Sequence, residues 1–243
     1  MKLRAISAIS VRARGLFVIF FLALSGCTLP RPASTPVVYD FGPGALKTPA
    51  STRIAPLPPI EITTPQASSA LGGVAVLYRL GYADAQALQP YTLARWSMPP
   101  AQLIDQRLRA QLSLRRPVIV TGEILQAKPP SRSASTPLQA ALPPPPPVKP
   151  MLNLRLTLEE FSQLFASPSQ SSGLLRLRAT LTLRHASHDT LLAQRSFIVQ
   201  QPAPSADASG GVRALTAATD QAISDIEQWL AQAEPAASET SVK

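Results

Sequence analysis

Cysteine and histidine are scarce in this 243-residue chain, which has one cysteine and two histidines. A lone Cys27 cannot form a disulfide within the chain and cannot build a site of several thiolates around a metal. His185 and His188 stand three residues apart beside Asp189, but no further histidine or cysteine can complete a zinc site around them. We interpret this segment as a polar hairpin turn, with a metal site as the weaker alternative, and we expect no metal and no cofactor.

Patterns typical of catalytic sites are also missing. Glu159–Glu160 is the only pair of adjacent carboxylates, and neighbours on a strand point to opposite faces unless a bulge intervenes. Asp105 and Arg109 are four residues apart on an expected helix, the spacing of a solvated ion pair. Neither Gly72–Gly73 nor Gly210–Gly211 is followed by the lysine of a phosphate-binding loop. We therefore predict no catalytic residues and no enzymatic activity.

The beginning of the chain has the pattern of a secretory signal. Its basic residues are Lys2, Arg4, Arg12 and Arg14. The apolar run that follows, Gly15–Leu24, is too short to span a bilayer as a helix and has the length of a signal-peptide core. Removal of residues 1–26 lowers the formal net charge from +9 to +5, because those four basic residues are lost with them. A secretory signal argues against nucleic acid as the partner.

The signal ends in Leu24, Ser25 and Gly26, and Cys27 follows directly. This stretch resembles the bacterial lipoprotein box. The resemblance implies cleavage before Cys27, diacylglycerol on the Cys27 sulfur and acylation of the new N-terminus. Such a covalent lipid anchor would hold the protein durably on a membrane. The alternative is a stray or buried thiol beside an uncleaved anchor.

Residues 27–36 are polar and contain prolines, which predicts a tether. Fully stretched, residues 28–36 reach roughly 30 Å, enough to hold a domain clear of the lipid headgroups. Threonine, not aspartate, stands at position 28. In the lipoproteins that this chain resembles, aspartate there favours retention in the inner membrane. We therefore expect an outer-membrane lipoprotein that faces the periplasm, with the inner membrane as the less favoured location.

Short apolar runs in the first half of the chain predict strands. Val37–Phe41 predicts the first, and Val74–Leu80 with Pro90–Trp96 predicts a hairpin. Arg53–Ile62 contains three prolines, which lack the N–H that a ladder needs, so we expect an edge strand or a polyproline segment there. Residues 126–150 include five consecutive prolines and predict a loop insertion with polyproline character.

Leucine alternates with polar residues over Leu152–Leu158 and again over Leu175–Leu183. A period of two over this length predicts strands with one buried face. Leu191–Val199 adds a third run, and the three together predict an antiparallel meander.

Two irregularities are expected in the meander. A three-residue loop, Ala186–His188, would place Leu183 opposite Leu191, Leu181 opposite Ala193 and Leu177 opposite Phe197, which keeps one face apolar. A bulge is expected at Glu159–Glu160, because the apolar positions are even-numbered up to Leu158 and odd-numbered afterwards.

Two apolar stripes predict helices. The first helix would begin after an N-cap at Ser97 and end near Arg115–Arg116, before Pro117. Its stripe is Ala101, Ile104, Leu108 and Leu112. The second would span roughly residues 212–233. Its stripe is Leu215, Ala218, Ala222, Ile226 and Leu230, with Trp229 at the flank.

These elements predict a single α/β domain over residues 37–233, in which an antiparallel-rich β-sheet carries both helices on one face. Residues 234–243 are a polar tail that we expect to be disordered.

Two features invite a binding interpretation. Trp96 precedes the first helix, where packing onto that helix is favoured over a binding role. Arg155, Arg176 and Arg178 share the polar face of the meander. A solvated face is the simplest interpretation, and a docking face for an acidic partner or anionic headgroups is the alternative.

The order of these parts resembles the ABC-type transport auxiliary lipoprotein family, a companion of MCE-type lipid transporters. The resemblance rests on the lipoprotein box, Tyr39–Gly42, Leu80–Pro100, Leu154–Phe165, Leu191–Phe197 and Gln228–Leu230. It implies a non-catalytic periplasmic lipoprotein that assists the movement of lipids or sterol-like molecules between membranes, with an MCE-domain protein as partner. The insertion at 126–150 departs from the usual pattern of that family.

A competing hypothesis is a regulatory or scaffold lipoprotein of envelope biogenesis, such as an activator of a peptidoglycan synthase. Both hypotheses have the membrane as a partner through the lipid on Cys27, and both leave open whether the chain forms a homo-oligomer.

Overall fold

The computed structural model describes residues 34–44, 57–120, 150–185 and 188–240, apart from the side chains of 235–240. The chain divides into a unit of residues 1–35 and a unit of residues 36–243, and all described elements belong to the second. Their order is β1 (Val37–Tyr39), β2 (Ile60–Ala67), η1 (Ser69–Leu71), β3 (Ala75–Leu80), β4 (Asp84–Trp96), α2 (Pro100–Leu112), β5 (Val118–Val120), β6 (Met151–Ser167), β7 (Gln170–Arg184), β8 (Asp189–Pro202) and α3 (Ala208–Thr240).

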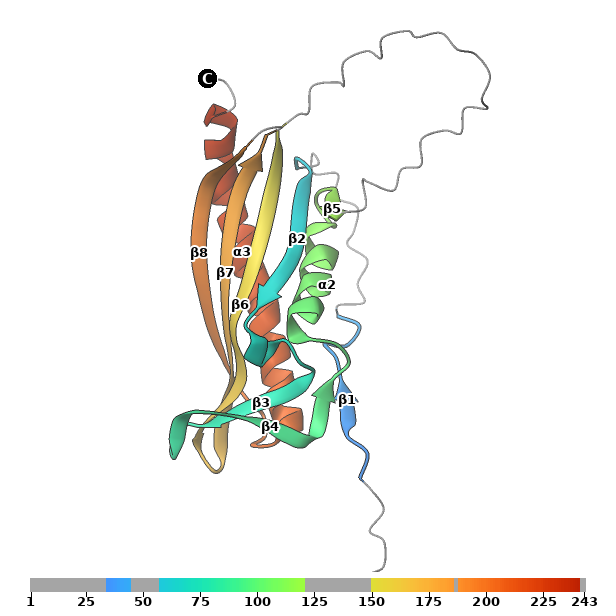
Figure 1. Ribbon diagram of the computed structural model, residues 1–243, viewed down its shortest axis with the longest axis vertical. Coiled ribbons are helices and arrows are strands. Elements are labelled where there is room, and N and C mark those ends of the chain that lie inside the picture. Colours follow the sequence, from blue (N-terminus) through green and yellow to red (C-terminus); the bar gives the residue numbers. More distant parts are fainter. Residues whose placement is uncertain (1–33, 45–56, 121–149, 186–187, 241–243) are drawn as a thin grey trace, which may run out of the picture. The chain divides into compact units, whose positions relative to one another are not determined.

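Strands β6, β7 and β8 form the long antiparallel meander that the leucine alternation predicts (Figure 1). On β7 the side chains of Leu175, Leu177 and Leu181 are at most 1% exposed, whereas Arg176 and Arg178 between them are exposed. One face of the meander therefore packs in the core, and the other face is exposed to solvent.

The other edge of β6 is shared by two strands, so that the sheet forks. β2 runs parallel to the first half of β6, from Ile60 opposite Leu152 to Ala67 opposite Leu158. β3 runs parallel to the second half, with Tyr78 opposite Gln163. β5 extends the β2 branch, while β4 and then β1 extend the β3 branch. The result is one eight-stranded mixed sheet.

The prediction of an edge strand over Arg53–Ile62 is wrong for Ile60–Ile62, the part that forms a strand, while residues 53–56 lie outside the described residues. β2 lies between β5 and β6, and Ile60 and Ile62 are fully buried. The prolines do not weaken this ladder because the last of the three, Pro59, precedes the first paired residue, Ile60. A later proline, Pro65, stands where the β2–β6 register is interrupted, between Thr63 and Gln66, so its missing N–H costs no ladder bond.

Both helices cover one face of the sheet, as predicted (Figure 1). α3 packs against β6, β7 and β8, and α2 packs against β2 and α3. The predicted stripes are buried: Ile104, Leu108, Leu215 and Ile226 are each 0% exposed. Among the described residues, no helix is both long and apolar enough to cross a bilayer.

The predicted helix ends need correction. Pro99, not Ser97, occupies the N-cap position of α2, since the ring of Pro100 presets the first helical φ angle. α2 ends at Leu112, so Arg115 and Arg116 lie beyond it. α3 does not stop at Ala233 but continues to Thr240. Glu234 forms a 2.6 Å ion pair with Arg116, whose side chain is 3% exposed, and this contact extends the packed part of the helix past the last apolar stripe residue.

The predicted bulge in β6 is confirmed. Leu158 pairs with Leu177 and Glu160 pairs with Arg176, which leaves Glu159 as the extra residue. The apolar side chains therefore stay on one face although their numbering changes from even to odd.

The predicted loop between β7 and β8 is wrong in its length. Arg184 pairs with Asp189, so four residues, not three, lie outside the ladder, and residues 186–187 of these are not described. Leu183 lies opposite Thr190, not Leu191. A second bulge, with Leu192 as the extra residue, then restores the predicted pairs of Leu181 with Ala193 and Leu177 with Phe197. Leu191 is consequently turned outward and is 61% exposed.

Trp96 belongs to the core, and the aromatic rings that it contacts are those of Phe41 and Phe161, outside the helix that it precedes. Its side chain is 1% exposed. The ring lies 5.6 Å from that of Phe41 and 5.5 Å from that of Phe161, measured between centroids. It thus joins the segment after β1 to β6 and is not available to a partner.

Candidate docking surface

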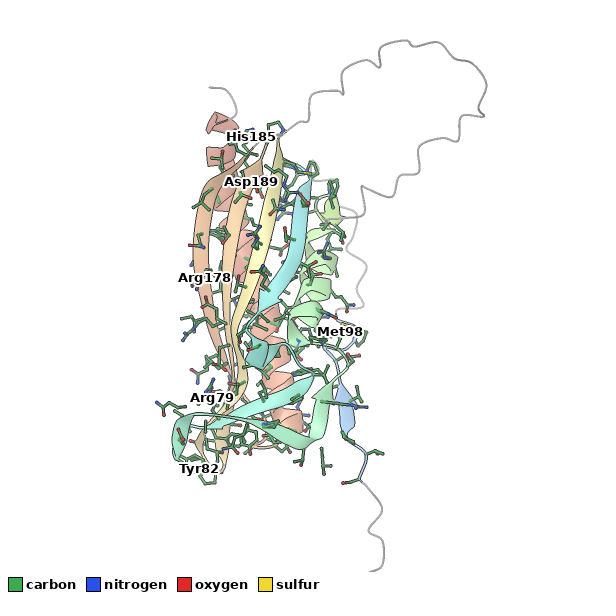
Figure 2. All side chains as sticks on the ribbon, in the orientation of Figure 1. Arg79, Tyr82, Met98, Arg178, His185 and Asp189 are labelled. Carbon is green, nitrogen blue, oxygen red and sulfur yellow. The ribbon has the colours of Figure 1, made fainter. Side chains whose placement is uncertain are left out.

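The structure brings the three arginines of the predicted docking face together. Arg155 on β6 and Arg176 and Arg178 on β7 are all exposed on the face of the sheet turned away from α3, called here the outer face. Arg155 lies opposite Thr180, and Arg178 lies opposite Thr157. Arg155 and Arg178 are therefore diagonal neighbours, within reach of each other's long side chains. Figure 2 shows Arg178 midway along the meander.

The bulge places both members of Glu159–Glu160 on this face. Glu159 forms an ion pair with Arg178. Glu160 forms one with Arg79 of β3, at 3.0 Å between Oε2 and Nη2. The hydroxyl of Ser162 donates a 2.6 Å hydrogen bond to Oε1 of Glu160. Each carboxylate is thus held by its own arginine, an arrangement that links strands.

Arg79 also fixes the hairpin that follows it. Its Nη1 donates hydrogen bonds to the carbonyl oxygens of Ala85, at 3.2 Å, and Gln86, at 3.0 Å. One guanidinium therefore ties the β3–β4 hairpin to the bulge in β6. No sequence motif singles out Arg79, although a lone arginine in the apolar run Val74–Leu80 is an available signal.

Strand β8 offers an open edge beside the arginines. In the described part of the chain it pairs only with β7. Leu191 and Ile198 on its outer side are each 61% exposed, and Ile198 lies opposite Arg176. Edges of this kind can accept a further strand from a partner.

The histidine segment closes the end of the β7–β8 hairpin. The backbone N–H of His185 donates a 2.9 Å hydrogen bond to the carbonyl oxygen of His188, and the two rings stack with centroids 4.7 Å apart. Neighbouring Arg184 forms a 2.5 Å ion pair with Glu61 of β2 and lies 3.7 Å from Asp189. Within the described residues no group of three or more metal-ligating side chains occurs.

An open cleft of about 270 Å³ lies between α2 and the segment Asp40–Pro43 that follows β1. Arg107 lines it, and its Nε donates a 2.8 Å hydrogen bond to Oδ1 of Asp220 on α3. This hydrogen bond raises the pKa of the guanidinium above its usual value. The charge of Arg107 is thereby engaged in joining the two helices.

Two other groups have shifted pKa values for structural reasons. Burial, with smaller contributions from Tyr78 and Asp207, raises the pKa of Tyr91 to about 12. Its protonated hydroxyl donates a 2.8 Å hydrogen bond to Oε1 of the fully buried Gln163. Asp207 accepts a 2.7 Å hydrogen bond from the backbone N–H of Gly210 in the first turn of α3. This bond is the largest cause of the lowered pKa of Asp207.

The remaining predicted site residues, Leu24, Ser25, Gly26 and Cys27, lie outside the described residues, as does nearly all of the insertion at 126–150. The lipid anchor therefore stays a prediction from sequence.

No family model and no curated protein matches the chain. The fold is similar to the crystal structure of protein XCC0632 from Xanthomonas campestris, described with the family model DUF330. The two chains are 17% identical with a TM-score of 0.56, and the match covers 86% of this chain and 94% of the other. A second crystal structure, titled only as an uncharacterized protein, is 14% identical with a TM-score of 0.50 and matches over 81% and 99% of the two chains. At these identities the likeness concerns the fold alone: this chain has the fold of a DUF330 protein.

Proposed function

We propose that this protein is an outer-membrane lipoprotein facing the periplasm, which docks onto an MCE-domain protein as a non-catalytic auxiliary component of an intermembrane lipid transport system. The order of its sequence motifs, from the lipoprotein box to Gln228–Leu230, supports this assignment. The proposed docking surface is the outer face around Arg155 and Arg176, together with the open edge of β8.

The observation that carries the proposal is that the two faces of the meander differ: one packs in the core, and the other exposes arginine side chains. The inner face, which packs against α3, is not accessible to a partner, since Leu154, Leu175 and Ala179 are 0% exposed. On the outer face Arg178 is paired with Glu159, whereas Arg155 and Arg176 form no ion pair with any described residue. Two unneutralised guanidinium groups beside an open edge favour an acidic partner segment.

The test is an association measurement between this protein and the MCE protein encoded beside it. We expect Arg155→Gln with Arg176→Gln to weaken association several-fold, mainly at low salt, because neutralising charged groups reduces steering toward an acidic partner. Arg178 is left intact, since its loss would also free the carboxylate of Glu159. Glutamine is preferred to glutamate because Arg176 lies opposite Glu160, where a new carboxylate would be repelled.

The matched control is Arg115→Gln with Arg213→Gln. Both of these arginines are exposed, and Arg213 lies on α3, away from the outer face, so the control removes the same charge elsewhere. Equal weakening by both variants would show a net-charge effect, not a docking face. No association of the unaltered protein, together with an intact lipid barrier in a deletion strain, would overturn the proposal in favour of an envelope scaffold. Binding to a peptidoglycan synthase would then be the next measurement.

A further inference from the structure

Two exposed apolar side chains, Val38 of β1 and Leu93 of β4, lie on the same side of the sheet as Arg95. Val37 is 52%, Val38 51% and Leu93 49% exposed. Val38 lies opposite Arg95 in the parallel pairing of β1 with β4. Exposure alternates from residue 93 to 96, so Leu93 and Arg95 share the outward side of β4 while Ala94 and Trp96 are buried. Val37 lies opposite Ala94 and points to the other side of the sheet, so the three residues Val38, Leu93 and Arg95 are called the β1–β4 patch.

The patch lies at an end of the strand order, where apolar exposure is costly. β1 pairs only with β4 among the described strands, and natural edge strands usually carry charge where they meet water. Tyr82, at the tip of the β3–β4 hairpin, is also 50% exposed. It lies at the other end of β4 from the residues that pair with β1 (Figure 2). Apolar side chains at an exposed edge indicate a surface that is covered in the working protein.

We infer that the β1–β4 patch rests on the membrane surface that holds the lipid anchor. This inference depends on the lipidation of Cys27 in the proposed function. Ten residues, 27–36, separate the anchor from Val37, and they reach at most roughly 35 Å when fully extended.

β1 is the first described strand after that tether. Few residues therefore separate the patch from the lipid anchor. Attachment through so few residues gives the patch a local concentration at the lipid surface on the order of millimolar. Contacts too weak to bind a free protein to a membrane then suffice to orient a tethered one.

The side chains of the patch suit a bilayer surface containing anionic lipid. Valine and leucine side chains can enter the boundary between headgroups and acyl chains. The guanidinium of Arg95 binds phosphate oxygens in a planar, bidentate fashion. Arg95 forms no ion pair with any described residue and is therefore available for such a contact.

The experiment uses the full mature chain, purified from membranes and reconstituted in vesicles of phosphatidylethanolamine and phosphatidylglycerol. Mass spectrometry first establishes whether lipid is attached to Cys27. A thiol introduced by Leu93→Cys is labelled with an environment-sensitive fluorophore, and quenching by brominated acyl chains reports its depth. The matched site is Ile198→Cys, since Ile198 is an exposed apolar residue on β8. Thermal unfolding verifies that both variants fold.

We expect the probe at position 93 to be quenched several-fold more strongly than the probe at position 198. Quenching at position 93 should rise with the phosphatidylglycerol content, and Arg95→Gln should abolish that rise. A lipidated chain whose probe at position 93 remains in water, or is quenched no more than the probe at position 198, would overturn this inference alone. A chain without lipid on Cys27 would overturn the proposed anchor and this inference together.

Discussion

The β6–β8 meander and the β3–β4 arm, residues Ala75–Trp96, are held to the domain in different ways. The meander buries a continuous row of leucines under α3 and pairs almost without interruption. The arm pairs with β6 only from Tyr78 to Leu80, and its own hairpin register is interrupted twice. Besides this pairing, two polar contacts hold the arm, Arg79 with Glu160 and Tyr91 with Gln163, and its ends are anchored by the buried side chains of Val76 and Trp96. Apolar area therefore stabilises the meander along its whole length, whereas the middle of the arm depends on a few directed bonds.

The first way to test this difference is to remove apolar area from the meander. Leu181 is 0% exposed and lies between Leu154 and Ala193. Leu181→Ala should lower the free energy of unfolding by about 3 kcal/mol, because it removes buried methyl groups and leaves a cavity. Urea unfolding measures the change. The control, Leu191→Ala on the exposed side of β8, should change it by less than about 0.5 kcal/mol; comparable losses in the two variants would contradict the assignment of faces.

The second test concerns the close approach of α3 to β7. A methyl group added at Gly173 would lie 2.6 Å from the backbone nitrogen of Leu215, whereas one at Gly73 would meet nothing within 4 Å. Gly173→Ala should therefore force helix and strand apart and cost about 2 kcal/mol. Gly73→Ala is the control and should be nearly neutral. If Gly173→Ala left the melting temperature unchanged, the tight packing of α3 on this end of β7 would be wrong.

The third test separates the arm from the meander. Glu160→Gln removes the charge that pairs with Arg79. In this ion pair the side chain of Arg79 is 20% exposed and that of Glu160 is 16% exposed. A partly exposed pair of this kind should contribute about 1 kcal/mol. The loss should increase amide hydrogen exchange in the arm while leaving exchange in β7 and β8 unchanged.

Glu159→Gln is the matched control for the arm, since Glu159 pairs with Arg178 of the meander and does not contact the arm. Faster exchange across the whole sheet in the Glu160 variant would show that the arm and the meander unfold as one unit.

The sequence predicts both the meander and the β3–β4 hairpin, but not the contacts that hold the hairpin to β6, for a physical reason. Alternation of leucine with polar residues is local, so it fixes the buried face and even the bulge at Glu159. The partner of Glu160 is 81 residues away, and a parallel neighbour such as β2 leaves no signature in β6. The predicted partner of Leu183 is wrong for a related reason. The loop length and the bulge at Leu192 shift the β7–β8 register by opposite amounts, so the apolar pattern shows only their net effect.

The candidate docking surface was likewise predicted only where its residues follow a local pattern. Arg155, Arg176 and Arg178 were found because they follow the period of the strands. The open edge of β8 and the β1–β4 patch were missed, because exposure at an edge depends on which strands are absent beside it. Strand order is a property of the whole fold, and a single sequence contains it only indirectly.

The smallest expected change in stability is at the N-terminus of α3, which follows β8. Asp207 accepts hydrogen bonds from the backbone N–H of Gly210 and from the hydroxyls of Ser205 and Ser209, which lower its pKa in the folded state. Asp207→Ala removes an N-cap and should cost about 1 kcal/mol at pH 7, whereas Asp207→Asn should cost less, because asparagine also caps helices.

The pH dependence identifies the contribution of the charge. A carboxylate whose folded pKa is lowered stabilises the fold at pH values above its unfolded pKa, about 3.9. That contribution is lost as the pH falls through the folded pKa. The stability difference between the unaltered protein and Asp207→Asn should therefore be constant from pH 6 to 8 and shrink below about pH 4. Urea unfolding at pH 7 and at pH 3 measures it, and a difference that is equal at both values would show that Asp207 caps α3 through its shape and not through its charge.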